Sequence, residues 1–369
     1  MSAESIFSIV SAYETDFLYR PVKVVEGYNF DQLKTVKAIN QMQAARYPNG
    51  NVDAFGNEMF YYDIVTPRVR NAAKNLDLDT KDIQFRAMNG KDWMKAWLFR
   101  RDARNWMRER KFAQLLNPMP EEIVGYGSVV VKKTEGKEVF RTVDLRNLMN
   151  DPAAHRLNDS WVIEDHYYTP TELRRKKGVW DSAIIEKAIQ SFKTNRRENY
   201  VDSNDSMPYG DAQFIKVREF YGHVQESTLD EKGNDDNYIL AQFILIMGER
   251  LSSQNKQSSG GAVENAEGLI LFKTKITQEK GLGDIYKEVH FRRIKGRWIG
   301  RGLYEELSEI QGMKNTEINQ VMMAMRLEAL IIFQTQDPTV ASNILKDLAN
   351  GDILKFKAKH ISEVIEPPA

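Results

Sequence analysis

The residues that could carry out chemistry are scattered along this sequence and do not fall into the spacings that catalysis or metal binding requires. Cysteine is absent, which excludes disulfides and thiolate metal sites. No Gly-x-Ser-x-Gly nucleophile elbow, Walker phosphate loop or zinc-protease helix motif occurs. The sequence therefore predicts a protein that is not an enzyme and has no catalytic, cofactor-binding or metal site. The histidines show no ligand spacing, and we expect ordinary surface or core roles for all of them: His155, His166, His223, His290 and His360.

Two groups of acidic residues invite a chemical role, and in both a structural explanation is simpler. The stretch 230–236 lacks the glycine and the bidentate glutamate of a calcium loop, so we interpret it as a solvated turn. Glu305, Glu306 and Glu309 could be proposed as catalytic acids. They stand near the start of a predicted helix, however, where the helix dipole favours negative charge.

Residues 91–116 interleave aromatic and basic side chains, which can bind nucleic acid by stacking and by phosphate contact. The alternative is an amphipathic helix with its tryptophans inward and its arginines in solvent. Asp92, Asp102 and Glu109 dilute the positive charge and favour this alternative. The aromatic and basic residues are Trp93, Trp97, Trp106 and Phe112 with Arg100, Arg101, Arg104, Arg108, Arg110 and Lys111.

A long amphipathic stretch at 302–334 is the element around which we expect the chain to be arranged. Its apolar residues recur at spacings of three and four, which predicts a helix of roughly 30 residues, about 45–50 Å long. Such a helix either runs through a core or projects and packs against copies of itself. We predict that Leu307, Ile310, Val321 and Met325 form the buried stripe of this helix. We predict that Met322, Met323 and Arg326 contact a neighbouring copy.

Other local signals predict a mixture of helices and strands. Thr169, Pro170 and Glu172 form a capping-box pattern that begins a short helix. Residues 1–30 resemble an arm rather than a domain. Further helices are expected at 30–46, 57–78 with a break near Pro67, 180–192 and 343–350. Residues 125–131 are expected to form a turn that runs into a β-branched strand, with 139–143 as its antiparallel partner. More strands are expected at 213–224, 238–247, 268–277, 285–294 and 353–357.

The charge balance and hydropathy restrict the class of protein. Lys and Arg total 52, as do Asp and Glu, so the net charge is zero. This argues against coating of nucleic acid by bulk charge, although local patches remain possible. The longest apolar run, at 238–247, is far shorter than the roughly 20 residues that span a bilayer. We expect a soluble protein of two or three domains with no membrane contact.

Several motifs, taken in order, resemble the portal (head–tail connector) proteins of tailed bacteriophages, of the podovirus-like kind. A helix followed by a β-branched strand is similar to the opening of the portal wing, and an Asp-Pro followed by a polar turn and a capped helix is similar to its second half. The strand at 215–221 is similar to the one that leads toward the clip, and the long helix resembles the return into the stem. The residues that carry this resemblance are 112–116, 125–131, 143–152, 158–164, 169–173, 215–221, Arg297, Trp298, Gln311, Asn315, Asn319 and Gln320.

The resemblance implies an α+β fold with a wing, a β-rich clip and a long stem helix. The helix at 181–195 is the candidate for the second, ascending stem helix. The end of the chain, Glu366-Pro-Pro-Ala, suggests a C-terminal truncation. The regions implied are an N-terminal arm at 1–30, an α/β wing at 31–210, a clip-like region at 211–299, a stem-like helix at 300–336 and a return to the wing at 337–369.

For function, the resemblance implies a ring of this chain, usually of twelve copies, at one vertex of the capsid. DNA passes through the axis of such a ring during packaging and ejection. Its implied partners are the terminase large subunit, the capsid and scaffold proteins and the tail adaptors, and its implied location is the virion, after assembly in the host bacterial cytoplasm. The alternative from the residues themselves is a monomeric nucleic-acid-binding module that uses the helix at 91–116.

Overall fold

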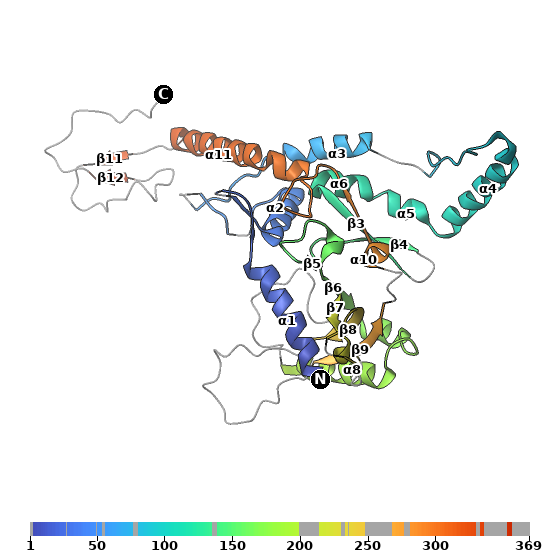
Figure 1. Ribbon diagram of the computed structural model, residues 1–369. Coiled ribbons are helices and arrows are strands. Elements are labelled where there is room, and N and C mark those ends of the chain that lie inside the picture. The colour runs from blue at the N-terminus through green and yellow to red at the C-terminus, as the bar shows by residue number, and fades with distance from the viewer. Residues whose placement is uncertain are drawn as a thin grey trace, which may run out of the picture.

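Two antiparallel sheets form the body of the molecule, and a layer of helices covers one end of it (Figure 1). The fold is therefore α+β, as predicted. The computed structural model describes residues 3–26, 28–48, 50–53, 56–76, 80–134, 139–198, 214–229, 233–234, 236–247, 268–276, 281–329, 333–335 and 353–355.

Helices account for the layer at the top of Figure 1, for one flank of the larger sheet and for two projections. No helix among the described residues combines the length and the apolar character needed to cross a membrane. The helices are α1 (Ala3–Tyr19), α2 (Gln32–Ala44), α3 (Val65–Asn75), α4 (Trp93–Glu109), α5 (Phe112–Leu116), α6 (Met119–Tyr126), α7 (Pro170–Arg175), α8 (Ser182–Glu198), α9 (Glu226–Leu229), α10 (Leu282–Ile285) and α11 (Leu303–Ala329), with single 3-10 turns η1 (Gly90–Asp92) and η2 (Leu157–Asp159).

Among the described residues, the strands form one sheet of five, one of three and two short pairs. Their orders are β5-β6-β7-β8-β9, β10-β3-β4, β1-β2 and β11-β12; every pairing is antiparallel except the last. The strands are β1 (Val22–Val25), β2 (Tyr28–Phe30), β3 (Ser128–Lys133), β4 (Phe140–Val143), β5 (Leu148–Asn150), β6 (Val162–Tyr168), β7 (Ile215–Gln225), β8 (Tyr238–Ile246), β9 (Leu269–Lys275), β10 (Tyr286–His290), β11 (Phe333–Thr335) and β12 (Ile353–Lys355).

The five-stranded sheet is buried on both faces by alternate residues of its strands, because side chains of a strand point to opposite faces in turn. On the central strand β7, Ile215 and Val217 pack with the cluster under α8, whereas Phe220 and Val224 pack with the cluster under α1. Strand β6 pairs with β7 over seven residue pairs. The boundary predicted at 210/211 therefore falls inside one sheet, and the β-rich region is continuous with part of the region predicted as the wing.

The N-terminal segment is an integral helix of this body. Ile6, Val10 and Phe17 of α1 are buried in the cluster that contains Phe220 and Phe243. The segment predicted as an arm thus covers one face of the larger sheet. The sequence signal was weak because the helix has a short apolar face that only a tertiary partner makes significant.

Glycine-rich segments hold the helical layer to the smaller sheet. The backbone at Gly300–Gly302 crosses the backbone at Gly125–Gly127 so closely that a Cβ on Gly302 would lie 2.1 Å from the Gly125 carbonyl oxygen. Gly127 also has a φ of 84°, in the left-handed region that favours glycine. Only glycine fits this crossing, which fixes where α11 leaves the body.

Most predicted elements are present. The structure confirms the capping box at Thr169, the hairpin of β3 and β4, the four strands from β7 to β10, the strand β12 and the long helix α11. The helix predicted at 57–78 begins only at Val65, so Pro67 lies in its first turn instead of breaking it. The helix predicted at 343–350 lies outside the described residues.

Two predictions about helices are wrong. The helix at 91–116 is interrupted at Lys111, whose φ of 55° is left-handed and separates α4 from α5. The candidate ascending stem helix, α8, packs through Ile185 and Ile189 on the larger sheet, at the end of the molecule remote from α11 (Figure 1). It therefore does not lie beside α11 in the subunit.

Candidate functional site

The long helix α11 is fastened to the body at its first turn. Arg297, which is 2% exposed, forms a two-pronged ion pair with Glu305, with Nη1–Oε1 and Nη2–Oε2 distances of 3.0 and 2.8 Å. Its guanidinium lies 4.2 Å from the centre of the Phe30 ring. Arg292 pairs with Glu306 at 2.6 Å. These contacts give the acidic residues at the helix start a structural role, beyond the dipole interaction that the sequence suggested.

A ladder of amide side chains fixes the inner face of α11. The amide oxygens of Gln311, Asn315 and Asn319 accept hydrogen bonds from the backbone N–H groups of Ile64, Tyr62 and Phe60 at 3.1, 2.9 and 2.8 Å, respectively. Asn319 also donates to the Phe60 carbonyl at 2.8 Å.

The geometry of a helix and an extended chain explains this ladder. Four residues of helix rise about 6 Å, and two residues of extended chain rise about 6.6 Å, so alternate residues of the segment meet every fourth residue of α11. The two run antiparallel. Beyond the ladder, Asp53 forms an ion pair with Arg326 at 2.8 Å, which gives the segment one more contact with α11. Gln311 and Asn315 are buried, and their side chains supply the hydrogen bonds that this stretch of backbone would otherwise lack.

Several large apolar residues of α11 are exposed, away from the buried amides. Ile310, Val321 and Met325 are 51%, 52% and 62% exposed, so the predicted buried stripe is wrong for them within the subunit. Leu307 is half-buried beside the cluster that includes Tyr304. Met322 and Met323 are half-buried, and Arg326 is exposed and holds Asp53. Contact of these residues with a neighbouring copy stays a prediction.

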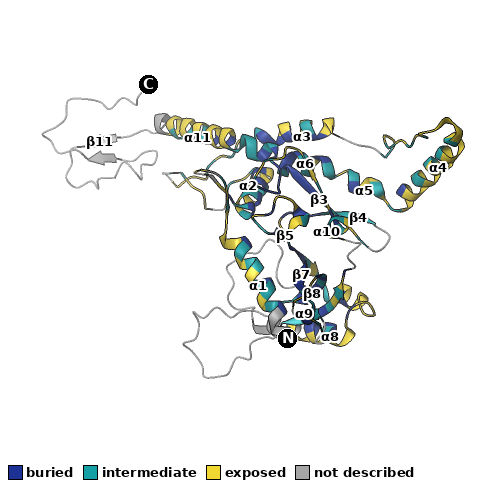
Figure 2. Cartoon of the chain, in the orientation of Figure 1, coloured by how far each residue is buried: buried dark blue, intermediate teal, exposed yellow. Residues whose placement is uncertain are grey.

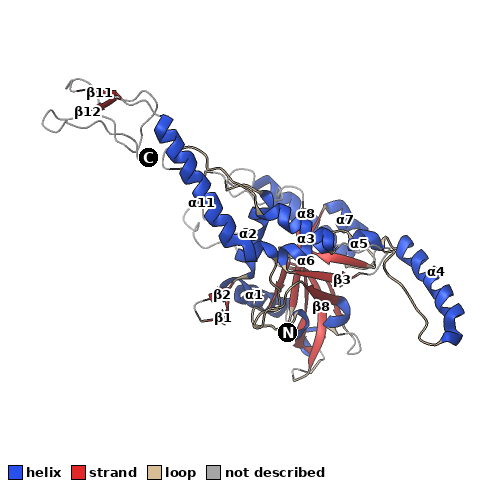
Figure 3. Ribbon diagram, turned by 90° about the horizontal axis from the view of Figure 1, so that it is seen from above, coloured by secondary structure: helices blue, strands red, loops and turns tan. Residues whose placement is uncertain are grey.

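The helix α4 projects from the other end of the molecule (Figures 1 and 3). Only Met107 of its 17 residues is buried. At its base Phe112 links Trp106 to Phe140, with both pairs of ring centres 6.3 Å apart. Along its length Arg100 donates to the Phe85 carbonyl oxygen at 2.9 Å.

The sequence favoured an amphipathic helix at 91–116 with its tryptophans buried, and this prediction is wrong. Trp93 and Trp97 are 61% and 51% exposed, and Figure 2 shows most of α4 as exposed. The Arg101 guanidinium lies 5.7 Å from the centre of the Trp97 ring. Periodicity showed that α4 has an aromatic side, but it could not show that no other element covers that side.

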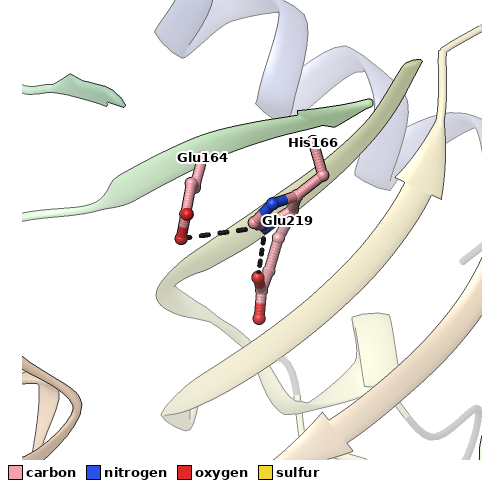
Figure 4. A group of neighbouring side chains, drawn as sticks. All are labelled: Glu164, His166 and Glu219. Carbon is pink, nitrogen blue, oxygen red and sulfur yellow. Dashed lines mark hydrogen bonds and ion pairs between the residues drawn. The ribbon is translucent and has the colours of Figure 1, made fainter. Parts of the chain in front are cut away.

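A buried charge cluster, comprising Lys132, Arg141, Glu164, His166 and Glu219, joins the two sheets. Lys132 on β3 lies 2.8 Å from Glu164 Oε2 and 2.5 Å from Glu219 Oε2, both on the larger sheet. Arg141 pairs with Glu164 at 2.5 Å, and His166 Nε2 lies 2.7 Å from Glu219 Oε2 (Figure 4).

The tyrosines around this cluster complete its hydrogen bonding. Tyr286 donates to Glu164 at 2.9 Å, and Tyr221 donates to Glu219 at 2.6 Å. Burial alone would raise the pKa of Glu219, but the bond with His166 and the charge of Lys132 outweigh it and lower that pKa. Burial and the neighbouring carboxylates raise the pKa of Tyr286. The Glu219 carboxylate is thus ionised and the Tyr286 phenol neutral at pH 7.

The same cluster contains a set of residue types that can bind a metal. One possible ligand atom from each of Glu164, His166 and Glu219 lies within 4.8 Å of the other two. However, the Lys132 ammonium already occupies the position between the two carboxylates where a cation would bind. A metal ion would have to displace a buried lysine, so the geometry favours a structural ion cluster.

A serine and a histidine are also in contact, across β3 and β10. Ser128 Oγ lies 2.8 Å from His290 Nδ1, and His290 Nε2 lies 3.4 Å from Glu288 Oε1. These are the residue types of a hydrolase triad. Ser128 is fully buried, and its hydroxyl accepts from the Gly300 N–H at 2.6 Å. A substrate cannot reach it, and the contact instead supports the glycine crossing below α11.

Sequence reasoning missed both buried groups because their members are far apart in the chain. A charged residue on a predicted strand is ordinarily assigned to the solvent face, and a single sequence contains no signal that pairs Lys132 with Glu219. In comparisons with protein-family models and with curated proteins, no family model and no curated protein matches the chain. Its function is therefore inferred from its own residues and their geometry.

Proposed function

We propose that the chain is a structural subunit that assembles into a ring, of the portal (head–tail connector) kind. The observation that carries the proposal is α11, which is rigidly held on its inner face and exposes Ile310, Val321 and Met325 on its outer face. A soluble protein rarely exposes a row of apolar residues unless a partner covers it. A helix that is anchored by buried amides and is apolar outward is suited to contact between copies.

The assignment to the portal kind is supported in addition by the order of motifs in the sequence, from the hairpin of β3 and β4 to the amides of α11. In this proposal the ring has about twelve copies, stands at a capsid vertex of the virion and conducts double-stranded DNA. The terminase large subunit, capsid or scaffold proteins and tail adaptors dock on it. No chemistry is required of the subunit, which agrees with charge clusters that are already internally paired.

Native mass spectrometry of the purified chain tests the ring. A discrete oligomer near twelve copies is expected, with a central channel in electron micrographs. Val321→Asp places a charge in the apolar row and is expected to abolish assembly. Val179→Asp is the matched control, because Val179 is equally a valine with a largely exposed side chain, on a different surface. A wild-type chain that stays monomeric at all concentrations would contradict the proposal.

A second candidate function is nucleic-acid binding by α4, and the exposure of its tryptophans favours it. Exposed aromatic rings stack on bases, and arginines beside them contact phosphates. The isolated protein would then bind DNA with an affinity that falls as salt rises. Arg104→Ala and Arg108→Ala would each weaken binding, whereas the exposed Arg175→Ala on α7 would not.

A further inference from the structure

One face of α4 is exposed and combines aromatic with basic side chains. Residues spaced by three and four fall on one side of a helix. The face, called the α4 stripe, is Trp93, Trp97, Arg101, Arg104 and Arg108, and all five are exposed. Apart from its two ends, α4 contacts the rest of the chain through Phe99 and Arg100, which touch Phe85. The five side chains of the α4 stripe remain exposed beside this contact.

An exposed face of α11 has the complementary composition. This face, called the α11 stripe, is Glu309, Ile310, Met313, Glu317 and Val321, all exposed. Met313 is 66% exposed. The stripe lies on the side of the helix away from the amide ladder, so it can receive a partner without disturbing the anchored face.

The charges of the two helices are opposite. The sequence of α4 contains five basic and two acidic residues. The α11 stripe carries two acidic residues, Glu309 and Glu317, and no basic residue; Glu317 also pairs with the exposed Lys314 beside it. Glu305 and Glu306 at the start of α11 are already paired with Arg297 and Arg292 and do not contribute. Opposite charges around an apolar centre orient two surfaces and speed their encounter. The tryptophans of one stripe and the Ile, Met and Val side chains of the other supply the apolar area.

The two stripes cannot meet within one subunit. In both Figure 1 and Figure 3, α4 and α11 project from opposite ends of the molecule. A contact between them must therefore join two copies. Because it uses different surfaces on the two copies, it is head-to-tail, and such a contact forms a ring when its rotation closes.

We propose that the α4 stripe of one copy docks on the α11 stripe of the next copy. This inference rests on the proposed ring and identifies the interface between its subunits. Nucleic acid on α4 is the competing occupant. It accounts for the basic stripe alone and leaves the acidic, apolar α11 stripe uncovered, whereas a second copy covers both.

Two variants that each damage one stripe test this interface. Trp97→Asp removes the aromatic centre of the α4 stripe, and Val321→Asp removes an apolar residue of the α11 stripe. Each variant alone is expected to be monomeric by native mass spectrometry. Their equimolar mixture is expected to form a dimer and nothing larger, because it contains one intact α4 stripe and one intact α11 stripe that can still pair. Val179→Asp is expected to form wild-type rings.

The outcomes separate this inference from the ring itself. Wild-type rings together with rings from Trp97→Asp alone would overturn the interface and leave the ring standing. Wild-type rings with no dimer in the mixture would overturn it as well. A monomeric wild type would overturn the ring and the interface together. Rings from Trp97→Asp that no longer bind DNA would assign α4 to nucleic acid instead.

Discussion

At the scale of single residues, Lys132 is the cation that holds the two sheets together. Its ammonium forms ion pairs with both Glu164 and Glu219, which are buried, and Arg141 and His166 pair with one carboxylate each. Tyr221 and Tyr286 donate further hydrogen bonds to the same carboxylates. A buried ion pair adds little net stability, but removal of one partner leaves a buried charge without compensation. The cluster therefore specifies how the sheets pack more than it stabilises them.

We predict that Lys132→Met destabilises the protein by about 3–5 kcal/mol. The free energy of unfolding in urea at pH 7 measures this. Lys133→Met is the control, since Lys133 is exposed on the same strand, and it should change the free energy by less than about 0.5 kcal/mol. Adding Glu219→Gln to Lys132→Met should restore part of the loss by removing an uncompensated charge. If both lysine variants lowered the free energy of unfolding equally, the destabilisation would not come from the buried charge cluster.

A second residue, Glu122 on α6, makes stability depend on pH near neutrality. Burial, and then the charge of Asp144, raise its pKa to about 7, against a hydrogen bond with Thr142 that lowers it. Between its ordinary value of 4.5 and about 7 the folded state binds more protons than the unfolded state. Stability from this group is therefore present at the lower pH and is lost as the pH rises through 7.

Glu122→Gln should accordingly leave stability nearly unchanged at pH 4.5 and raise it at pH 8, by on the order of 1–3 kcal/mol. Thermal or urea unfolding across this range tests the sign. Glu121→Gln, exposed one residue earlier, is the matched control and should show a small difference without this slope. A gain for Glu122→Gln that is the same at both pH values would exclude ionisation as its cause.

At the scale of elements, the amide ladder of α11 shows what sequence periodicity can and cannot predict. The apolar spacing predicted a long helix, and α11 extends from Leu303 to Ala329. The same spacing suggested that Ile310 and Val321 face inward. The buried face instead carries Gln311 and Asn315, because their partner is a backbone segment about 250 residues away, and nothing in the local pattern encodes that segment.

Strands were easier to predict, for a physical reason. Runs of alternating or continuous β-branched residues, such as Ser128–Lys133 and Tyr238–Ile246, predict a strand from local sequence alone, and each needs only another strand to pair with. How those strands combine depends on contacts such as Lys132 with Glu219 and the Gly127–Gly300 crossing, which are local in space and remote in sequence. The boundary predicted at 210/211 failed to mark a separate unit for this reason.

The ladder itself is testable through Asn315→Leu. The substitution keeps the number and branching of the side-chain heavy atoms and removes the acceptor of the Tyr62 N–H, which then has no partner in a half-buried position. The expected cost is about 1–3 kcal/mol, the penalty of an unsatisfied buried donor. Hydrogen exchange of the Tyr62 amide should become faster, with the Val69 amide in α3 unchanged. Gln320→Leu, on an exposed position of the same helix, should alter neither quantity.

At the scale of the whole molecule, the body buries its apolar side chains, whereas the two projections expose many of theirs. Four clusters of buried apolar residues fill the body and its helical layer, and the buried charges in it are paired. The apolar residues that are left exposed include groups on α4 and on the outer part of α11, at opposite ends (Figure 2). The proposed ring would cover the apolar residues that these two projections expose.

The absence of cysteine allows a direct count of the copies that such an assembly contains. We predict that a chain carrying both Trp97→Cys and Met313→Cys, treated with a flexible bismaleimide, gives a ladder of covalent bands on a denaturing gel that ends at the copy number of the ring. Each cysteine alone should give only the monomer band, because a head-to-tail contact never brings two identical stripes together. A dimer band from either single variant would indicate a contact between like surfaces, which cannot propagate around a ring. A ladder that continues without an end would indicate that the head-to-tail rotation does not close, so that the chain forms a filament and the portal interpretation fails even though the interface is right.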